Sequence, residues 1–81
     1  MYFVYIIYSE KTDQFYVGSS QNVEERVRRH NAGHSRSTKS KAPWKLVKSI
    51  ALKTRSEAMQ LENKIKGRGI KRYLYDHEQS G

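Results

Sequence analysis

The stretch YFVYIIYSEKTDQFYVG, residues 2–18, decides the fold because it holds two strand-like segments joined by a short polar turn. Residues 2–8 are aromatic or β-branched at every position, which predicts a central strand covered on both faces. Residues 9–14 are rich in turn formers, and residues 15–18 resume strand character up to Gly18. Too little chain separates the two segments for a parallel crossover, so we predict an antiparallel hairpin.

The next segment carries the signals of a helix over residues 23–31. Asn22 is a suitable cap, Glu25 follows it at capping distance, and Val23 with Val27 form an apolar stripe one turn apart. Gly33 suits the left-handed conformation in which many helices end. A polar, basic loop is expected from residue 34 to residue 42.

A further strand and a further helix follow. Pro43 precedes an alternating run at residues 44–50, which predicts a third strand that begins with a core Trp44. Residues 54–57 have the spacing of a capping box, and apolar residues then recur at helical spacing up to Gly67. The order strand, strand, helix, strand, helix predicts an α/β (α+β) fold, with helices packed on a small three-stranded antiparallel sheet.

The length and composition indicate one small domain. A chain of 81 residues buries only about 60% of its unfolded surface, so residues 1–81 are expected to form a single domain with a modest core. The polar end should be frayed from about residue 76. The absence of cysteine excludes disulfides and thiolate metal sites, and no apolar stretch is long enough to span a bilayer. We therefore expect a cytoplasmic protein without a membrane segment.

The charge favours a polyanionic partner. Sixteen Lys and Arg against eight Asp and Glu give a formal net charge of +8, although such an excess can also be a merely solvated surface. The positive residues cluster between Tyr, Trp and His side chains, which can stack on bases or sugars. The candidates for nucleic-acid binding are Arg28, Arg29, Arg36, Lys39, Lys41, Lys66 and Arg68.

Two pairs of residues are candidates for chemistry. Tyr5 lies mid-strand and Tyr16 lies two residues before Gly18, so a hairpin can bring both hydroxyls to one side of the sheet. Each tyrosine alone is more often a packing residue. Arg26 and His30 are four residues apart and hence share one helical face.

Glu62 is the fifth candidate. It shares the apolar strip of its helix, where an unpaired charge is costly unless a cation or hydrogen bonds satisfy it. The alternative is a surface ion pair with Lys66 one turn later. Zinc between His30 and His34 is disfavoured, because the intervening glycine breaks the helix and no third ligand is apparent.

Taken together, these residues resemble the GIY-YIG nuclease superfamily, in particular its small stand-alone bacterial members. The resemblance rests on residues 3–5 (FVY), residues 16–18 (YVG) eleven positions after Tyr5, the helical segment 22–30 and Glu62, and it covers nearly the whole chain. The chain has Phe3 where the first motif opens with glycine. No residue matches the asparagine that some larger relatives add after the glutamate.

The resemblance implies a metal-dependent endonuclease that hydrolyses phosphodiester bonds, with DNA favoured over RNA. Tyr5 and Tyr16 match the motif tyrosines, Arg26 the essential arginine, His30 a frequent partner on that helix and Glu62 the ligand of Mg²⁺ or Mn²⁺. Related domains act in homing endonucleases and in excision repair, which suggests DNA repair or recombination, with a separate protein supplying specificity. The alternative is a nucleic-acid-binding module with the same fold and no turnover.

The physics of hydrolysis suggests a role for each of these residues. A tyrosine with a free pKa of about 10 is a poor base, so we expect Arg26 and His30 to lower the pKa of Tyr5, or in second place of Tyr16. Arg26 stays protonated and can hold a phosphate as a fixed donor fork. Mg²⁺ commonly uses one carboxylate and keeps several waters.

Overall fold

The computed structural model describes residues 1–34, 36 and 38–79, with side chains described up to residue 76. Its elements are β1 Tyr2–Ser9, β2 Gln14–Ser20, α1 Val23–Asn31, a short 3₁₀ turn η1 Lys39–Lys41, β3 Trp44–Leu52, α2 Arg55–Arg68 and α3 Ile70–Gln79. The predicted sequence of two strands, a helix, a strand and a helix is confirmed, and a third helix is added at the end.

The three strands form one antiparallel sheet in the order β2-β1-β3, so β1 is central as predicted. In the register between β1 and β2, Tyr5 pairs with Gly18 and Ile7 pairs with Tyr16. Paired residues lie on the same face of a sheet, and residues two apart on one strand do too. Tyr5 and Tyr16 therefore share one face.

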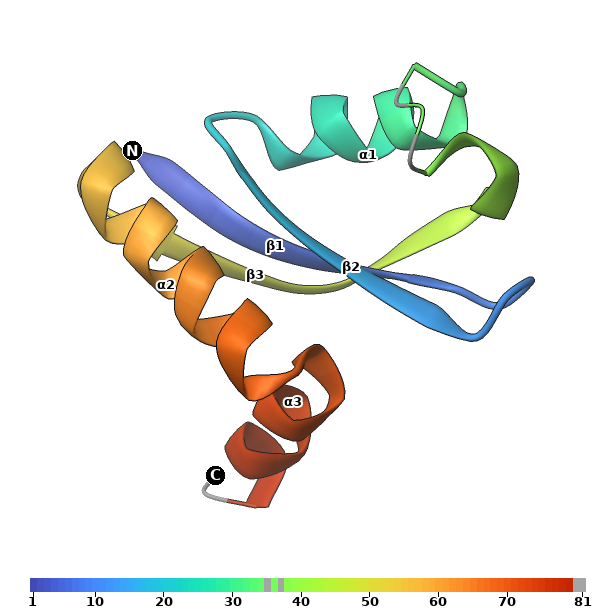
Figure 1. Ribbon diagram of the computed structural model, residues 1–81. Helices are drawn as coiled ribbons and strands as arrows, with labels where there is room; N and C mark the ends of the chain where they lie inside the picture. The colour runs from blue at the N-terminus through green and yellow to red at the C-terminus, as the bar shows by residue number, and fades with distance from the viewer. Residues whose placement is uncertain (35, 37, 80–81) are drawn as a thin grey trace.

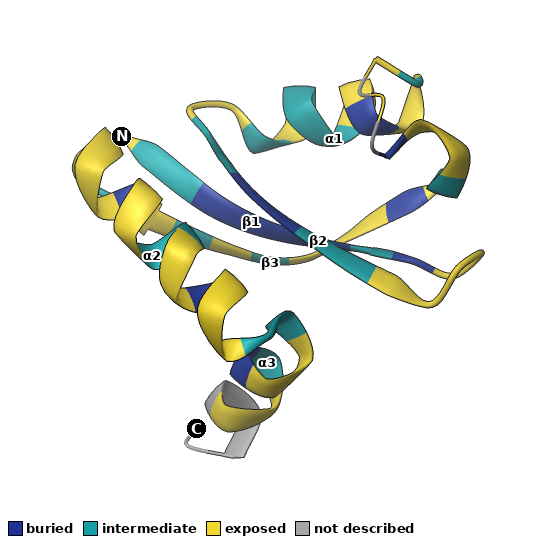
Figure 2. Ribbon diagram, viewed as in Figure 1, coloured by how far each residue is buried: buried dark blue, intermediate teal, exposed yellow. Residues whose placement is uncertain are grey.

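The sheet is covered on both faces (Figure 1). One face packs under α1 around buried Tyr5, Ile7 and Trp44. The opposite face packs against α2 and α3, and its buried residues are Val4, Ile6, Val17, Ala58, Ile65 and Tyr73. Figure 2 shows the buried residues running along the strands, with the outer surfaces of the helices exposed. The apolar pattern on both faces of β1 follows from this double covering.

Both helix starts use the caps that the sequence predicts. The Asn22 side chain accepts a hydrogen bond from the Glu25 N–H at 3.1 Å. Thr54 Oγ1 accepts from the Glu57 N–H at 3.1 Å and donates to the Glu57 carboxylate at 3.2 Å, which is a capping box. After α1, Gly33 has a φ of +81°, the left-handed conformation expected of it.

The segment from residue 68 onward differs from expectation, because it contains the helix α3. Gly69, with a φ of +98°, separates α3 from α2. Tyr73 is 7% exposed and joins the core beneath the sheet, which explains why a polar-looking segment folds back as a helix. The helix α3 continues to Gln79, and residues 80 and 81 lie outside the described residues. Fraying from about residue 76 stays a prediction.

The expected basic loop from residue 34 to residue 42 contains the turn η1 and a cis peptide bond before Pro43. Residues 35 and 37 of this loop lie outside the described residues. Thr38 is nonetheless well inside the protein, with 1% of its surface exposed. In the part of the chain that the structure describes, no helix combines the length and the apolar character needed to cross a bilayer.

Candidate active site

Tyr5 lies at the centre of the face under α1 and is completely buried. Its ring lies over Gly18 of β2, because a Cβ added to that glycine would come within 2.6 Å of the Tyr5 hydroxyl oxygen. Only glycine leaves this space open. Since β2 is an edge strand, the ring carries its hydroxyl from the centre of the sheet toward the sheet edge.

His30 connects this hydroxyl to the loop after α1. The Tyr5 hydroxyl lies 2.9 Å from His30 Nε2, and His30 Nδ1 lies 2.7 Å from Thr38 Oγ1. All three side chains are buried. A buried phenol needs an acceptor for its proton, and the neighbouring Arg26 can only donate. The arrangement therefore favours the tautomer in which Nε2 accepts from Tyr5 and Nδ1–H donates to Thr38.

The pKa directions in this pair differ from the sequence-based expectation. Burial raises the pKa of Tyr5, and Arg26, through its charge and a hydrogen bond, lowers it by less. The nearby Tyr16 and Glu62 add to the increase. Burial, followed by the charge of Arg26, lowers the pKa of His30. The expectation that Arg26 and His30 would lower the pKa of Tyr5 is wrong, because the desolvation of a buried phenol cannot be predicted from residue spacing. Near neutrality both Tyr5 and His30 are uncharged.

Tyr16 lies beside His30 on the same face of the sheet. Its half-buried ring lies 5.0 Å from the His30 ring, centroid to centroid, at an angle of 61°. The Trp44 ring is 6.3 Å away on another side. The hydrogen bond with Glu62 contributes most to the raised pKa of Lys66, and Tyr16 adds a smaller increase. Tyr16 therefore lies beside His30 and near Lys66 of α2.

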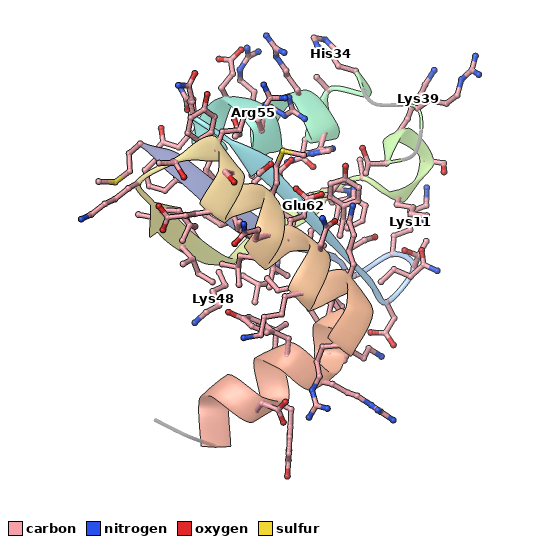
Figure 3. All side chains as sticks on the ribbon, turned by 60° about the vertical axis from the view of Figure 1, so that its left-hand side comes forward. Lys11, His34, Lys39, Lys48, Arg55 and Glu62 are labelled. Atoms are coloured by element: carbon pink, nitrogen blue, oxygen red, sulfur yellow. The ribbon has the colours of Figure 1, made fainter. Side chains whose placement is uncertain are left out.

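Glu62 belongs to α2 and contributes a carboxylate to the site around Tyr5. Its carboxylate pairs with the Lys66 ammonium at 2.8 Å, so the expected ion pair exists. The Glu62 side chain is nevertheless only 19% exposed, against 55% for Lys66, and its charge is felt by Tyr5. Figure 3 labels Glu62 on α2, near the centre of this view. The charges of Arg26 and Glu62 therefore both act on Tyr5.

The donor chemistry of the site suits a hydrated magnesium ion. Mg²⁺ is commonly held by one or two carboxylates and completes its shell with water and substrate oxygens. Glu62 provides such a carboxylate beside the two tyrosines. Zinc sites in proteins use three or four His, Cys, Asp or Glu side chains, and among residues 1–34, 36 and 38–76 no group of three such side chains converges.

Two residues of the site escaped the sequence analysis in their structural roles. Thr38 lies in the segment expected only as a polar, basic loop, yet its side chain is bonded to His30 and its carbonyl accepts a hydrogen bond from the Trp44 indole N–H at 3.0 Å. No spacing rule connects a loop threonine to a histidine eight residues earlier. Gly18 was noted only as a strand end, although a glycine beside two tyrosines signals a close approach.

The residues predicted to bind nucleic acid all lie at the surface. Arg28, Arg29, Arg36, Lys39, Lys66 and Arg68 are exposed and Lys41 is half-buried. Four of these side chains are already paired: Arg28 and Arg29 share Glu25, Lys66 pairs with Glu62, and Arg68 pairs with Asp76 at 2.6 Å. Their charges are partly compensated within the domain.

The model of the GIY-YIG catalytic domain family matches residues 1–76. The chain belongs to this family. The GIY-YIG domain is 40% identical over 67 residues to a UPF0213 protein of Haloquadratum walsbyi, covering 80% of this chain and 73% of the relative. It is 39% identical over 66 residues to a UPF0213 protein of Staphylococcus haemolyticus, covering 80% of this chain and 79% of the relative.

A solved structure has the same fold. The solution NMR structure of a UPF0213 protein from Bacillus halodurans superimposes with a TM-score of 0.60 at 25% identity, covering all of this chain and 87% of the other. The names of these UPF0213 relatives state no activity. For this GIY-YIG domain the activity must therefore be argued from its side chains.

Proposed function

We propose that this GIY-YIG domain is a metal-dependent endonuclease that hydrolyses phosphodiester bonds, with DNA as its substrate. The observation that carries the proposal is the arrangement around Tyr5: a buried phenol bonded to a neutral histidine, with an arginine and a half-buried carboxylate acting on it. Binding alone does not require such a set. Membership of the catalytic-domain family supports the same reading.

In this proposal Tyr5 and His30 relay a proton. Tyr5 is fully buried in the free protein, so the step requires substrate binding to bring an attacking water to its oxygen. That water gives its proton to the Tyr5 oxygen as the phenol proton moves to His30 Nε2, which lies 2.9 Å away. The resulting hydroxide forms the new bond to phosphorus, and the bond to the leaving oxygen breaks. His30 starts neutral because its pKa is lowered by burial, so it can accept that proton. Tyr5 need not become an anion beforehand.

Arg26 and Glu62 would stabilise the negative charge that develops on the phosphate and on the leaving oxygen. Arg26 cannot lose its proton near neutrality, so it can hold the scissile phosphate as charge accumulates on it. Glu62 would hold Mg²⁺ or Mn²⁺, which supplies positive charge for the leaving oxygen and orients bound water. Tyr16, whose ring contacts His30 and which lies near Lys66, would orient water or substrate within the same site.

Cleavage assays on a labelled panel of duplex, branched and single-stranded DNA and RNA test this proposal. We expect cleavage with Mg²⁺ or Mn²⁺, none with EDTA, and losses of about 10² to 10³-fold for Arg26→Ala and Glu62→Gln. The exposed Arg55 and Glu24 provide matched controls, Arg55→Ala and Glu24→Gln, which remove the same charges elsewhere. Equal cleavage by the parent and both site variants would refute the proposal.

The wider role follows from the substrate. A small domain with one cutting site and no recognisable base-reading element fits DNA repair or recombination, in a cytoplasm where a separate protein supplies specificity. The exposed basic residues would contact the phosphate backbone without reading sequence. If the panel shows binding without turnover in every metal, the domain is a nucleic-acid-binding module with a nuclease fold.

A further inference from the structure

A second polar hollow lies at the end of α1, adjoining the site around Tyr5. It has a volume of about 270 Å³ and is lined by Arg26, Arg29, His30 and His34. Arg29 and His30 come three and four residues after Arg26, one helical turn along the same face of α1. The backbone N–H of His34 is fixed by a hydrogen bond to the Arg29 carbonyl at 3.0 Å. The lining thus contains two guanidinium groups and two imidazoles.

The backbone around this hollow does not oppose an anion as strongly as a bare helix end would. Carbonyl groups at the end of a helix carry partial negative charge when they have no donor. Here the N–H groups of Ala32, Gly33 and His34 bond the carbonyls of Arg28, His30 and Arg29. The cationic side chains therefore dominate the field in the hollow.

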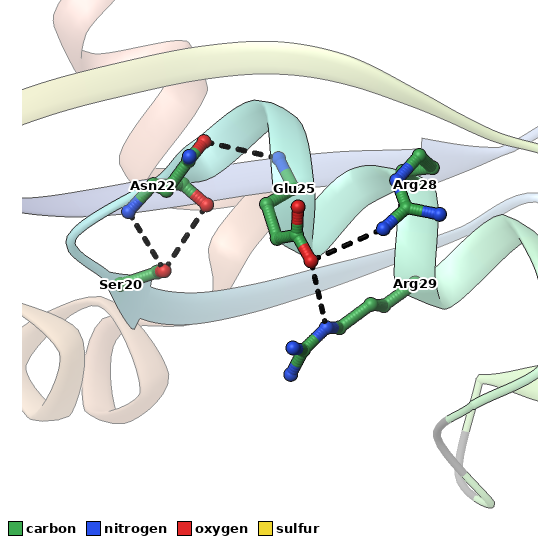
Figure 4. Close-up of polar contacts among 5 residues, drawn as sticks. All are labelled: Ser20, Asn22, Glu25, Arg28 and Arg29. Carbon is green, nitrogen blue, oxygen red and sulfur yellow. Dashed lines mark hydrogen bonds and ion pairs between the residues drawn. The ribbon is translucent and has the colours of Figure 1, made fainter.

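Arg29 keeps donors available for a ligand. Among the described residues, Glu25 is the carboxylate paired with Arg29, and it takes the Nε–H at 3.2 Å. The two terminal amino groups of the guanidinium can thus donate elsewhere. Arg28 uses the same Glu25 oxygen from a different direction, as Figure 4 shows, and Arg28 does not line the hollow.

We infer that this hollow binds the phosphate next to the scissile one, with Arg29 and His34 as its ligands and Arg26 facing both phosphates. The helical rise puts the Arg29 backbone about 4.5 Å beyond that of Arg26 along α1, and both side chains line the same hollow. Two long guanidinium side chains can therefore hold neighbouring phosphates from this one face of the helix. The assignment to a flanking phosphate rests on the proposed function; the anion site itself does not.

The first experiment titrates the full chain with inorganic phosphate and measures binding by NMR chemical shifts. The expected result is saturable shifts at residues 26–34, with binding weakened about 10-fold or more by Arg29→Gln and by His34→Asn. Arg28→Gln is the matched control, since it removes the same charge from the same Glu25 partner. Equal weakening by Arg28→Gln and Arg29→Gln would overturn the site, because net charge alone would then explain it.

A set of oligonucleotides distinguishes a backbone phosphate from free phosphate. Each carries a single uncharged methylphosphonate one position before or after the cleaved bond. The parent should bind one member of the set about 10-fold more weakly than the unmodified strand, and Arg29→Gln should no longer distinguish the two. If the parent tolerates the neutral linkage at both positions, the hollow does not take a flanking phosphate.

The two proposals fail in different ways. The phosphate titration is measured without metal and without a strand, so the anion site can be confirmed even if no strand is ever cut, in which case the nuclease proposal falls and the hollow remains an anion site. If cleavage depends on Arg26 and Glu62 but Arg29→Gln behaves like Arg28→Gln, the nuclease proposal stands and the flanking-phosphate site falls.

Discussion

The phenol of Tyr5 is held by contacts from every side. Its ring depends on the missing side chain of Gly18, its hydroxyl is bonded to His30, and Arg26 and Glu62 act on its charge. Desolvation keeps the proton on the phenol, so its role has to be a transfer at the moment of reaction. The residues that orient His30 then matter as much as Tyr5 itself.

Thr38 should be one of these positioning residues. Thr38→Val keeps the shape of the side chain and removes the oxygen that lies 2.7 Å from His30 Nδ1. The tautomer of His30 is then no longer fixed, and its buried Nδ1–H is left unpaired. We expect a loss of about 1–3 kcal/mol in the free energy of unfolding, measured with urea, and a slower cleavage step. Thr38→Ser should restore both. If the serine variant is as slow as the valine variant, the hydroxyl is not the important group.

His30 should make stability depend on pH. Its pKa is lowered, so between that pKa and about 6.5 the unfolded chain binds more protons than the folded one. The free energy of unfolding therefore rises with pH across this range: the contribution is complete above about pH 7 and is lost as the pH falls through the lowered pKa. Urea titrations at pH 5 and pH 7.5 should show a smaller pH effect in His30→Asn. An unchanged pH effect would contradict the assignment.

At the scale of the elements, the position of α1 relative to the sheet sets the site. Arg26 and His30 both belong to α1, and Asn31 ties the end of this helix to β3. The Asn31 side chain accepts from the Trp44 N–H at 2.5 Å and donates to the Trp44 carbonyl at 3.2 Å. These two bonds join the helix to the start of a strand, and they hold the His30–Tyr5 contact in register.

Removing this connection should loosen the helix. For Asn31→Ala we expect a loss of about 1–3 kcal/mol in the free energy of unfolding, from two hydrogen bonds, together with faster amide exchange at the end of α1. The control is Asn63→Ala, on the exposed side of α2. The account of α1 is wrong if Asn31→Ala and Asn63→Ala are equally mild.

The sequence predicted the elements whose signals are local. The caps at Asn22 and Thr54, the apolar β1 and the turn at Gly33 each follow from a few neighbouring residues. The helix α3 was missed because its folding depends on Tyr73 reaching a core built by distant strands. The site residues were grouped by resemblance, whereas the Thr38 contact and the direction of the Tyr5 pKa depend on packing that no spacing reveals.

At the scale of the whole molecule, the charge of +8 should govern binding to nucleic acid. Each phosphate contacted releases condensed counterions, so the logarithm of the association constant should fall linearly with the logarithm of salt concentration. The slope on duplex DNA should be about −0.9 for each contact, and Lys39→Gln should make it shallower by about one contact. Fluorescence anisotropy between low and moderate salt measures it; a flat response would argue against a phosphate-tracking surface.

The central claim is that side chains from β1, α1 and α2 act as one catalytic unit, and a double-mutant cycle tests it most directly. Single-turnover cleavage with Mg²⁺ would be measured for the parent, Arg26→Ala, Glu62→Gln and the double variant. Groups that act as a unit are strongly non-additive, so the double variant should be no more than about 10-fold slower than the slower single variant. Independent sites would instead give a double variant whose loss is the product of the two single losses. That product, or full activity in either single variant, would contradict the account.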